Sequence, residues 1–111
     1  MYAALFGNGV AEMCILYIVN YGEGHIRGIA ATCGLHVRSV QLQLEKLEAG
    51  GILVNQMAGN TKLFKINPRL PIKAELIALA NKILSLFPED EVEQYFRQRR
   101  RPRRTGKDRL P

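Results

Sequence analysis

The stretch 29–44 constrains this chain more than any other, because it joins two helical patterns through one glycine. A short helix is predicted over about 27–32, and its small Ala30 lets a second helix approach closely. Gly34 can adopt the turn conformation between the helices, which a bulkier residue would strain. The second helix is predicted over 37–48 from the spacing of its apolar stripe. That stripe consists of Val40, Leu44 and Leu47.

The neighbouring segments predict a helix before this pair and a hairpin after it. The first helix is expected over 9–20, with Asn8 as its cap. Two stretches rich in β-forming residues, 52–57 and 62–66, flank a turn signal at 58–61. Together they predict a β-hairpin.

A long helix is predicted over 72–87, and its apolar face is wider than one small domain usually needs to cover. We interpret this face as a homodimer interface. The alternative is packing against the first helix of the same chain. The residues assigned to the interface are Ile72, Leu76, Leu79, Ile83 and Phe87.

The order helix, short helix, turn, helix and hairpin is that of a winged helix-turn-helix. Over about residues 5–87 the chain resembles the winged-helix transcriptional regulators of the broad ArsR and MarR type. The motifs that carry the resemblance are Leu5-Phe6-Gly7, the helix-turn-helix, the run 47–53, Gly59-Asn60 and Asn67-Pro68. The resemblance implies an α+β fold, mostly α, with a winged helix-turn-helix and a long C-terminal helix.

The resemblance also implies that 37–48 is a recognition helix that enters the major groove of double-stranded DNA. Its contact residues would be Arg38, Ser39, Gln41, Leu42 and Glu45. Arginine can read guanine, and glutamine can read adenine. The predicted hairpin would be the wing of this fold, and it would approach the phosphates or the minor groove through Asn60, Thr61 and Lys62.

Two departures from the family pattern lower the positive charge of this surface. Leu42 stands where a polar or basic contact residue is usual, and Asn55, Gln56 and Met57 stand where arginines are common. Fewer cations mean weaker phosphate binding. A winged helix used for protein–protein interaction in a larger assembly is therefore the alternative function.

The formal net charge of +6 belongs to one end of the chain. Residues 97–111 hold eight of the 16 Lys and Arg and one of the ten acidic residues, whereas residues 1–96 have a balance of −1. We therefore divide the chain into a domain over 1–87 and an extension over 88–111, with a short helix and then a disordered basic tail. This tail is interpreted as an arm that follows nucleic-acid phosphates through Arg99, Arg100, Arg101, Arg103 and Arg104.

Other functions have little support in the sequence. Cys33 and His36 are only two possible ligands, whereas zinc takes three or four from the protein, so no metal site is predicted. No catalytic constellation and no cofactor motif appear, and an enzyme is not expected. The longest apolar run, 13–19, is too short to span a membrane. The two cysteines and the lack of a signal peptide favour a cytoplasmic protein.

These observations predict a sequence-specific DNA-binding transcriptional regulator, with repression as the favoured mode. As a homodimer it would place two recognition helices about 34 Å apart, which predicts a palindromic site.

Overall fold

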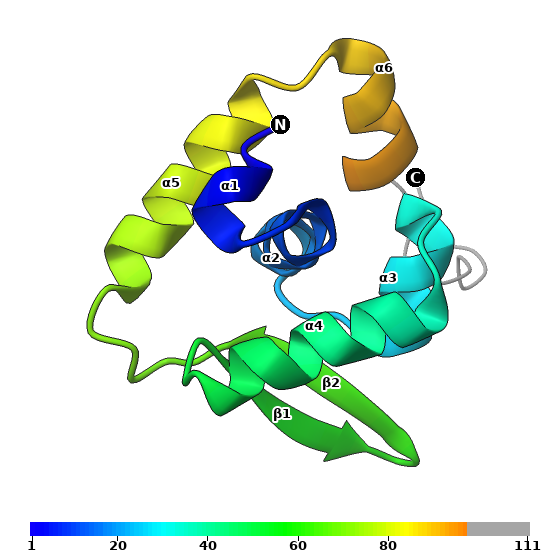
Figure 1. The fold of residues 1–111 in the computed structure, drawn as a ribbon, viewed down its shortest axis with the longest axis vertical. Helices are drawn as coiled ribbons and strands as arrows, with labels where there is room; N and C mark the ends of the chain where they lie inside the picture. Colours follow the sequence, from blue (N-terminus) through cyan, green and yellow to red (C-terminus); the bar gives the residue numbers. More distant parts are fainter. Residues whose placement is uncertain (98–111) are drawn as a thin grey trace, which may run out of the picture.

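A computed structural model describes residues 1–97 and places helix α2 (Gly9–Tyr21) at the centre of the fold (Figure 1). The Asn8 side chain caps this helix by accepting a 2.8 Å hydrogen bond from the amide of Ala11. Gly22 ends it in the left-handed conformation, with φ of 92°. The predicted start and the predicted cap are confirmed.

Helix α2 is buried on more sides than its sequence indicated. Figure 1 shows it almost end-on, with α5 on one side, α3 and α6 on the other, and the hairpin beyond α4. A helix that is apolar nearly all round is one that other elements surround. Its buried residues are Ala11, Glu12, Cys14, Ile15, Leu16, Tyr17 and Ile18.

The one buried charge of the described core, Glu12, ties the start of the chain to α2. Its carboxylate accepts hydrogen bonds from the ammonium of Met1, at 2.8 Å, and from the amide of Tyr2, at 2.7 Å. Burial of a carboxylate is costly unless the group is paired and hydrogen-bonded. These bonds hold the short helix α1 (Ala3–Phe6) beside α2.

The helix-turn-helix consists of α3 (Ile26–Cys33) and α4 (Val37–Ala49). Gly34 lies between them with φ of 66°, as the sequence predicted, and the amide of Leu35 donates to the carbonyl of Ala30 at 2.9 Å. The two helices share one set of fully buried side chains, namely Ile29, Val40 and Leu44. This packing fixes the angle between them.

The predicted hairpin forms from β1 (Leu53–Ala58) and β2 (Thr61–Ile66), which pair antiparallel from Leu53↔Ile66 to Ala58↔Thr61. It is also attached to the helical body. Gly24 and Phe64 exchange two backbone hydrogen bonds, of 2.9 and 2.8 Å. A Cβ at Gly24 would lie 2.9 Å from the ring of Tyr17, so this close approach requires glycine.

The last long helix, α5 (Lys73–Ser85), is followed by α6 (Glu89–Glu91) and by one π-helical turn, η1 (Val92–Phe96). This segment folds back onto α2. The side chain of Asn20 donates to the carbonyl of Phe96, and the hydroxyl of Tyr21 donates to that of Tyr95, each at 2.7 Å. The chain therefore remains part of the folded body beyond Phe87. The predicted disordered tail, 99–111, lies outside the described residues.

Helices and one two-stranded sheet make up the described structure, which confirms the predicted α+β, mostly α, class.

Replacing Leu16 with alanine tests the central role of α2. Because Leu16 is fully buried, we expect the free energy of unfolding, measured in urea, to fall by about 2–5 kcal/mol. Leu5→Ala removes the same atoms from an exposed position on α1 and should change stability by less than about 0.5 kcal/mol. Equal losses in the two variants would contradict the central position of α2.

Candidate nucleic-acid interface

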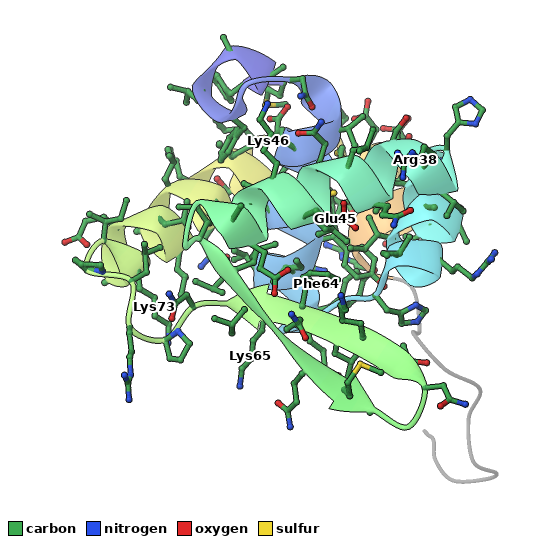
Figure 2. All side chains as sticks on the ribbon, turned by 60° about the horizontal axis from the view of Figure 1, so that its bottom comes forward. Arg38, Glu45, Lys46, Phe64, Lys65 and Lys73 are labelled. Carbon is green, nitrogen blue, oxygen red and sulfur yellow. The ribbon has the colours of Figure 1, made fainter. Side chains whose placement is uncertain are left out.

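Helix α4 presents one exposed stripe on the side opposite to its buried residues. Val40 and Leu44 anchor the inner side. Positions three or four residues apart share a helix face, and the exposed residues follow that spacing. They are Arg38, Leu42, Glu45, Lys46 and Ala49, and Val37 is also exposed at the start of the helix. Figure 2 shows Arg38 near one end of α4 and Lys46 and Glu45 farther along it.

The five predicted contact residues of α4 are not equally accessible. Arg38, Leu42 and Glu45 are exposed, whereas Ser39 and Gln41 are half-buried. The side-chain amide of Gln41 donates to Oε2 of Glu45 at 3.1 Å. Within residues 1–97, no carboxylate forms an ion pair with Arg38. The guanidinium of Arg38 is thus free of ion pairs within the described chain, whereas the side chain of Gln41 is engaged by Glu45.

The tip of the wing projects beyond the helical body. Asn60, Thr61 and Lys62 are all exposed there, and Gly59 adopts φ of 63° in the turn. The ammonium of Lys62 lies 6.0 Å from the ring centroid of Phe64. At the base of the wing, Asn55 hydrogen-bonds Glu48 of α4. The wing and α4 therefore form one continuous surface.

Two lysines that the sequence analysis did not single out lie at the base of the wing. Lys65 and Lys73 line a cavity of about 230 Å³ between α2, β2 and the start of α5. In Figure 2, Lys65 lies below α4 and Lys73 lies to its left. Only the fold brings them to one cavity, since they are eight positions apart in the sequence. They add positive charge near the wing.

The charge of this surface is otherwise mixed. Arg38 and Lys46 share α4 with Glu45 and Glu48. Arg97, the first cation of the basic C-terminal segment, pairs with Glu93 at 2.5 Å and Glu89 at 2.6 Å. Those hydrogen bonds raise its pKa. The five arginines of the predicted arm, at positions 99–101, 103 and 104, lie outside the described residues.

The structure separates the predicted interface residues of α5 into an inner and an outer group. Ile83 is in the core at 2% exposure, Leu76 is half-buried, and the ring of Phe87 packs edge-on against Phe96. Ile83 is therefore not a surface residue of the single chain. Ile72 and Leu79 remain exposed, at 54% and 40%.

Leu86 extends that outer group. It is 47% exposed and follows Leu79 by seven residues, as Leu79 follows Ile72. Seven residues are close to two full helical turns, so these three side chains form a line along α5 and its end. The sequence analysis did not assign Leu86 to the interface, although its spacing of seven residues from Leu79 could have indicated it.

The two cysteines and the two histidines lie in different environments of the fold. Cys14 and Cys33 are buried free thiols, and His25 caps α3 by accepting a 3.1 Å hydrogen bond from Gly28. His36 is exposed at the start of α4. Among residues 1–97, no three His, Cys, Asp or Glu side chains gather as metal ligands would.

Comparison with known proteins identifies the fold. No protein family and no curated protein matches the chain. Among solved structures, an apo-form mutant of ZitR from Lactococcus lactis matches with a TM-score of 0.52 and 20% identity, over 74% of this chain and 70% of that one. The chain has the winged helix-turn-helix fold. The expected fold is confirmed.

A second solved structure, the YusO protein from Bacillus subtilis, matches with a TM-score of 0.48 and 17% identity. The match covers 73% of this chain and 66% of the YusO chain.

Within residues 1–97, no helix is both long and apolar enough to cross a bilayer.

Burial should protect both thiols. It raises the pKa of Cys14 to about 12, with a contribution from the charge of Cys33, and the pKa of Cys33 to about 11. At about pH 8 we expect slow reaction with a thiol reagent in the folded chain and rapid reaction after denaturation in urea.

The same pKa values set the sign of a pH effect on stability. Because they lie above the ordinary 9.0, the contribution of the neutral thiols to the free energy of unfolding is complete below about pH 9. It is lost as the pH rises toward 11 and 12.

In the thiol-reagent experiment, rapid modification of both thiols in the native protein would contradict their burial.

Proposed function

We propose that this protein is a DNA-binding transcriptional regulator whose helix α4 enters the major groove. The observation that carries the proposal is the uncovered outer stripe of α4, held rigidly by α3 and flanked by an exposed wing. The fold is shared with ZitR of Lactococcus lactis, and the sequence resembles the winged-helix transcriptional regulators. In such a fold the second helix of the helix-turn-helix reads bases.

The exposed side chains suggest a division of roles. Arg38 can donate two hydrogen bonds to guanine, the commonest specific contact in the major groove. Lys62, with Asn60 and Thr61, is placed to bind phosphates beside the groove. Lys65 adds to this group at the base of the wing. The arginines of the C-terminal segment supply further sequence-independent attraction.

We infer a homodimer from the outer line of α5. Ile72, Leu79 and Leu86 expose large apolar side chains in one row, which favours a symmetric partner with the same row. Such a dimer presents two recognition helices to successive turns of the duplex and reads a palindrome. Bound at a promoter in the cytoplasm, it would repress transcription by occupying the site.

A protein-interaction module is the second candidate function. Leu42 and Met57 are exposed apolar side chains on the very surface assigned to DNA, at 45% and 57% exposure. The mixed charge of α4 also favours a protein partner over a polyanion. The two functions differ in whether α4 distinguishes one duplex sequence from another.

Arg38→Ala is the direct test of base reading. After selection of preferred duplexes with the full chain, fluorescence anisotropy should show that the substitution weakens binding to the selected site by about 5- to 150-fold. The expected cause is loss of the guanine contact.

Lys82→Ala is the matched control, because it removes one cation from an exposed position on α5. It should change affinity for the selected site only slightly. If both variants bind equally weakly, Arg38 contributes only charge. If the wild-type chain enriches no sequence at all, the protein-interaction function is favoured instead.

Leu79→Glu tests the homodimer. A carboxylate in the middle of the outer line of α5 should convert the protein to a monomer, measured by analytical ultracentrifugation. Met57→Glu places the same charge at an exposed position on β1 and should leave the assembly unchanged. A monomeric wild-type protein, or a dimeric Leu79→Glu variant, would overturn this interface.

A further inference from the structure

Three exposed side chains on α4 differ in the chemistry that they offer to a ligand. Arg38 only donates hydrogen bonds, Leu42 offers an apolar surface, and an ionised Glu45 only accepts. Helical rise places their Cα atoms about 6 Å and then about 4.5 Å apart along the axis. Base pairs stack at about 3.4 Å, so the three side chains span roughly three base-pair steps, that is, about four base pairs.

Leu42 has no role in the core that would explain it. Val40 and Leu44, on either side of it, are fully buried, whereas Leu42 keeps 45% of its surface exposed. In a major groove, the one apolar group on the edges of the bases is the C5 methyl of thymine. A leucine in the middle of the exposed stripe is suited to that methyl group.

Glu45 is unfavourable to a phosphate but suited to a base edge that donates. Gln41 donates a hydrogen bond to Oε2 at 3.1 Å, and within residues 1–97 Oε1 accepts no hydrogen bond. In the major groove a carboxylate pairs with the N4 amino group of cytosine. The fixed position of the carboxylate favours a cytosine at one step from the Leu42 contact.

We propose that α4 reads thymine through Leu42 and a nearby cytosine through Glu45, with Gln41 as the positioning residue. This inference rests on the proposed function, because it assumes that α4 lies in the major groove. The inference adds a predicted specificity. The exposed stripe of α4 would contact a guanine, a thymine methyl group and a cytosine amino group within about four base pairs.

Deoxyuridine substitution tests the thymine contact, because it removes only the C5 methyl group. In each half of the selected site, thymines are replaced singly by deoxyuridine and the affinity of the full chain is measured. We expect one position at which wild-type binding weakens about fourfold, the effect of removing one methyl contact. Leu42→Ala should bind the thymine and deoxyuridine duplexes equally well at that position.

Leu5→Ala is the matched control, since it shortens an exposed leucine on α1 instead of α4. It should retain the fourfold sensitivity to deoxyuridine. A selected site that binds tightly but shows no sensitivity at any thymine would overturn the inference and leave the proposed function intact. Failure to select any site would remove the proposed function itself.

Glu45→Ala tests the cytosine contact. It should reduce discrimination against thymine in place of that cytosine about tenfold, and it should strengthen binding to unrelated duplexes because a negative charge has been removed. Gln41→Ala should lower the same discrimination while leaving the deoxyuridine effect unchanged. Unaltered discrimination in Glu45→Ala would overturn this part of the inference.

Discussion

Burial of α2 on nearly every side is the constraint on which the rest of the structure depends. Helix α2 contacts α1, α4, α5, β2 and η1, so each of these elements is positioned by its packing against α2. Such a helix cannot be stable alone in water, because its apolar surface needs cover. In the folded chain, the elements that contact α2 provide this cover.

Helix α4 contacts α2 on one side, and its other side is exposed, as the proposed DNA binding requires. Val40 and Leu44 provide its attachment, and they leave Arg38, Leu42 and Glu45 outward. The rigidity of the attachment matters for recognition, because base edges differ by the positions of single donors, acceptors and methyl groups. If α4 moved relative to the rest of the domain, it would discriminate less well between bases.

Local signals explain what the sequence predicted well. The cap at Asn8, the turn at Gly34 and the hairpin turn all depend on neighbouring residues, and each was expected where it occurs. The inward turn of Ile83 and the return of Phe96 to α2 depend on contacts between residues far apart in the chain. No periodicity within one segment reports such contacts, so the interface on α5 was assigned too broadly.

The same limit applies to the proposed binding surface. Position within the exposed stripe could be predicted for Arg38 and Glu45, because a helix and its buried face were evident from the spacing. That Gln41 serves Glu45 and is itself half-buried required side-chain geometry.

The return of η1 to α2 also decides where the basic C-terminal segment is tethered. The bonds from Asn20 and Tyr21 fix Phe96 and Tyr95 at the end of α2, and η1 also touches α3. The described chain thus ends beside the helix-turn-helix and not at the far end of α5. A short tether raises the effective concentration of one binding element at the other. In the function that we propose, binding of DNA by the helix-turn-helix would therefore make any contact of the following basic sequence an intramolecular event.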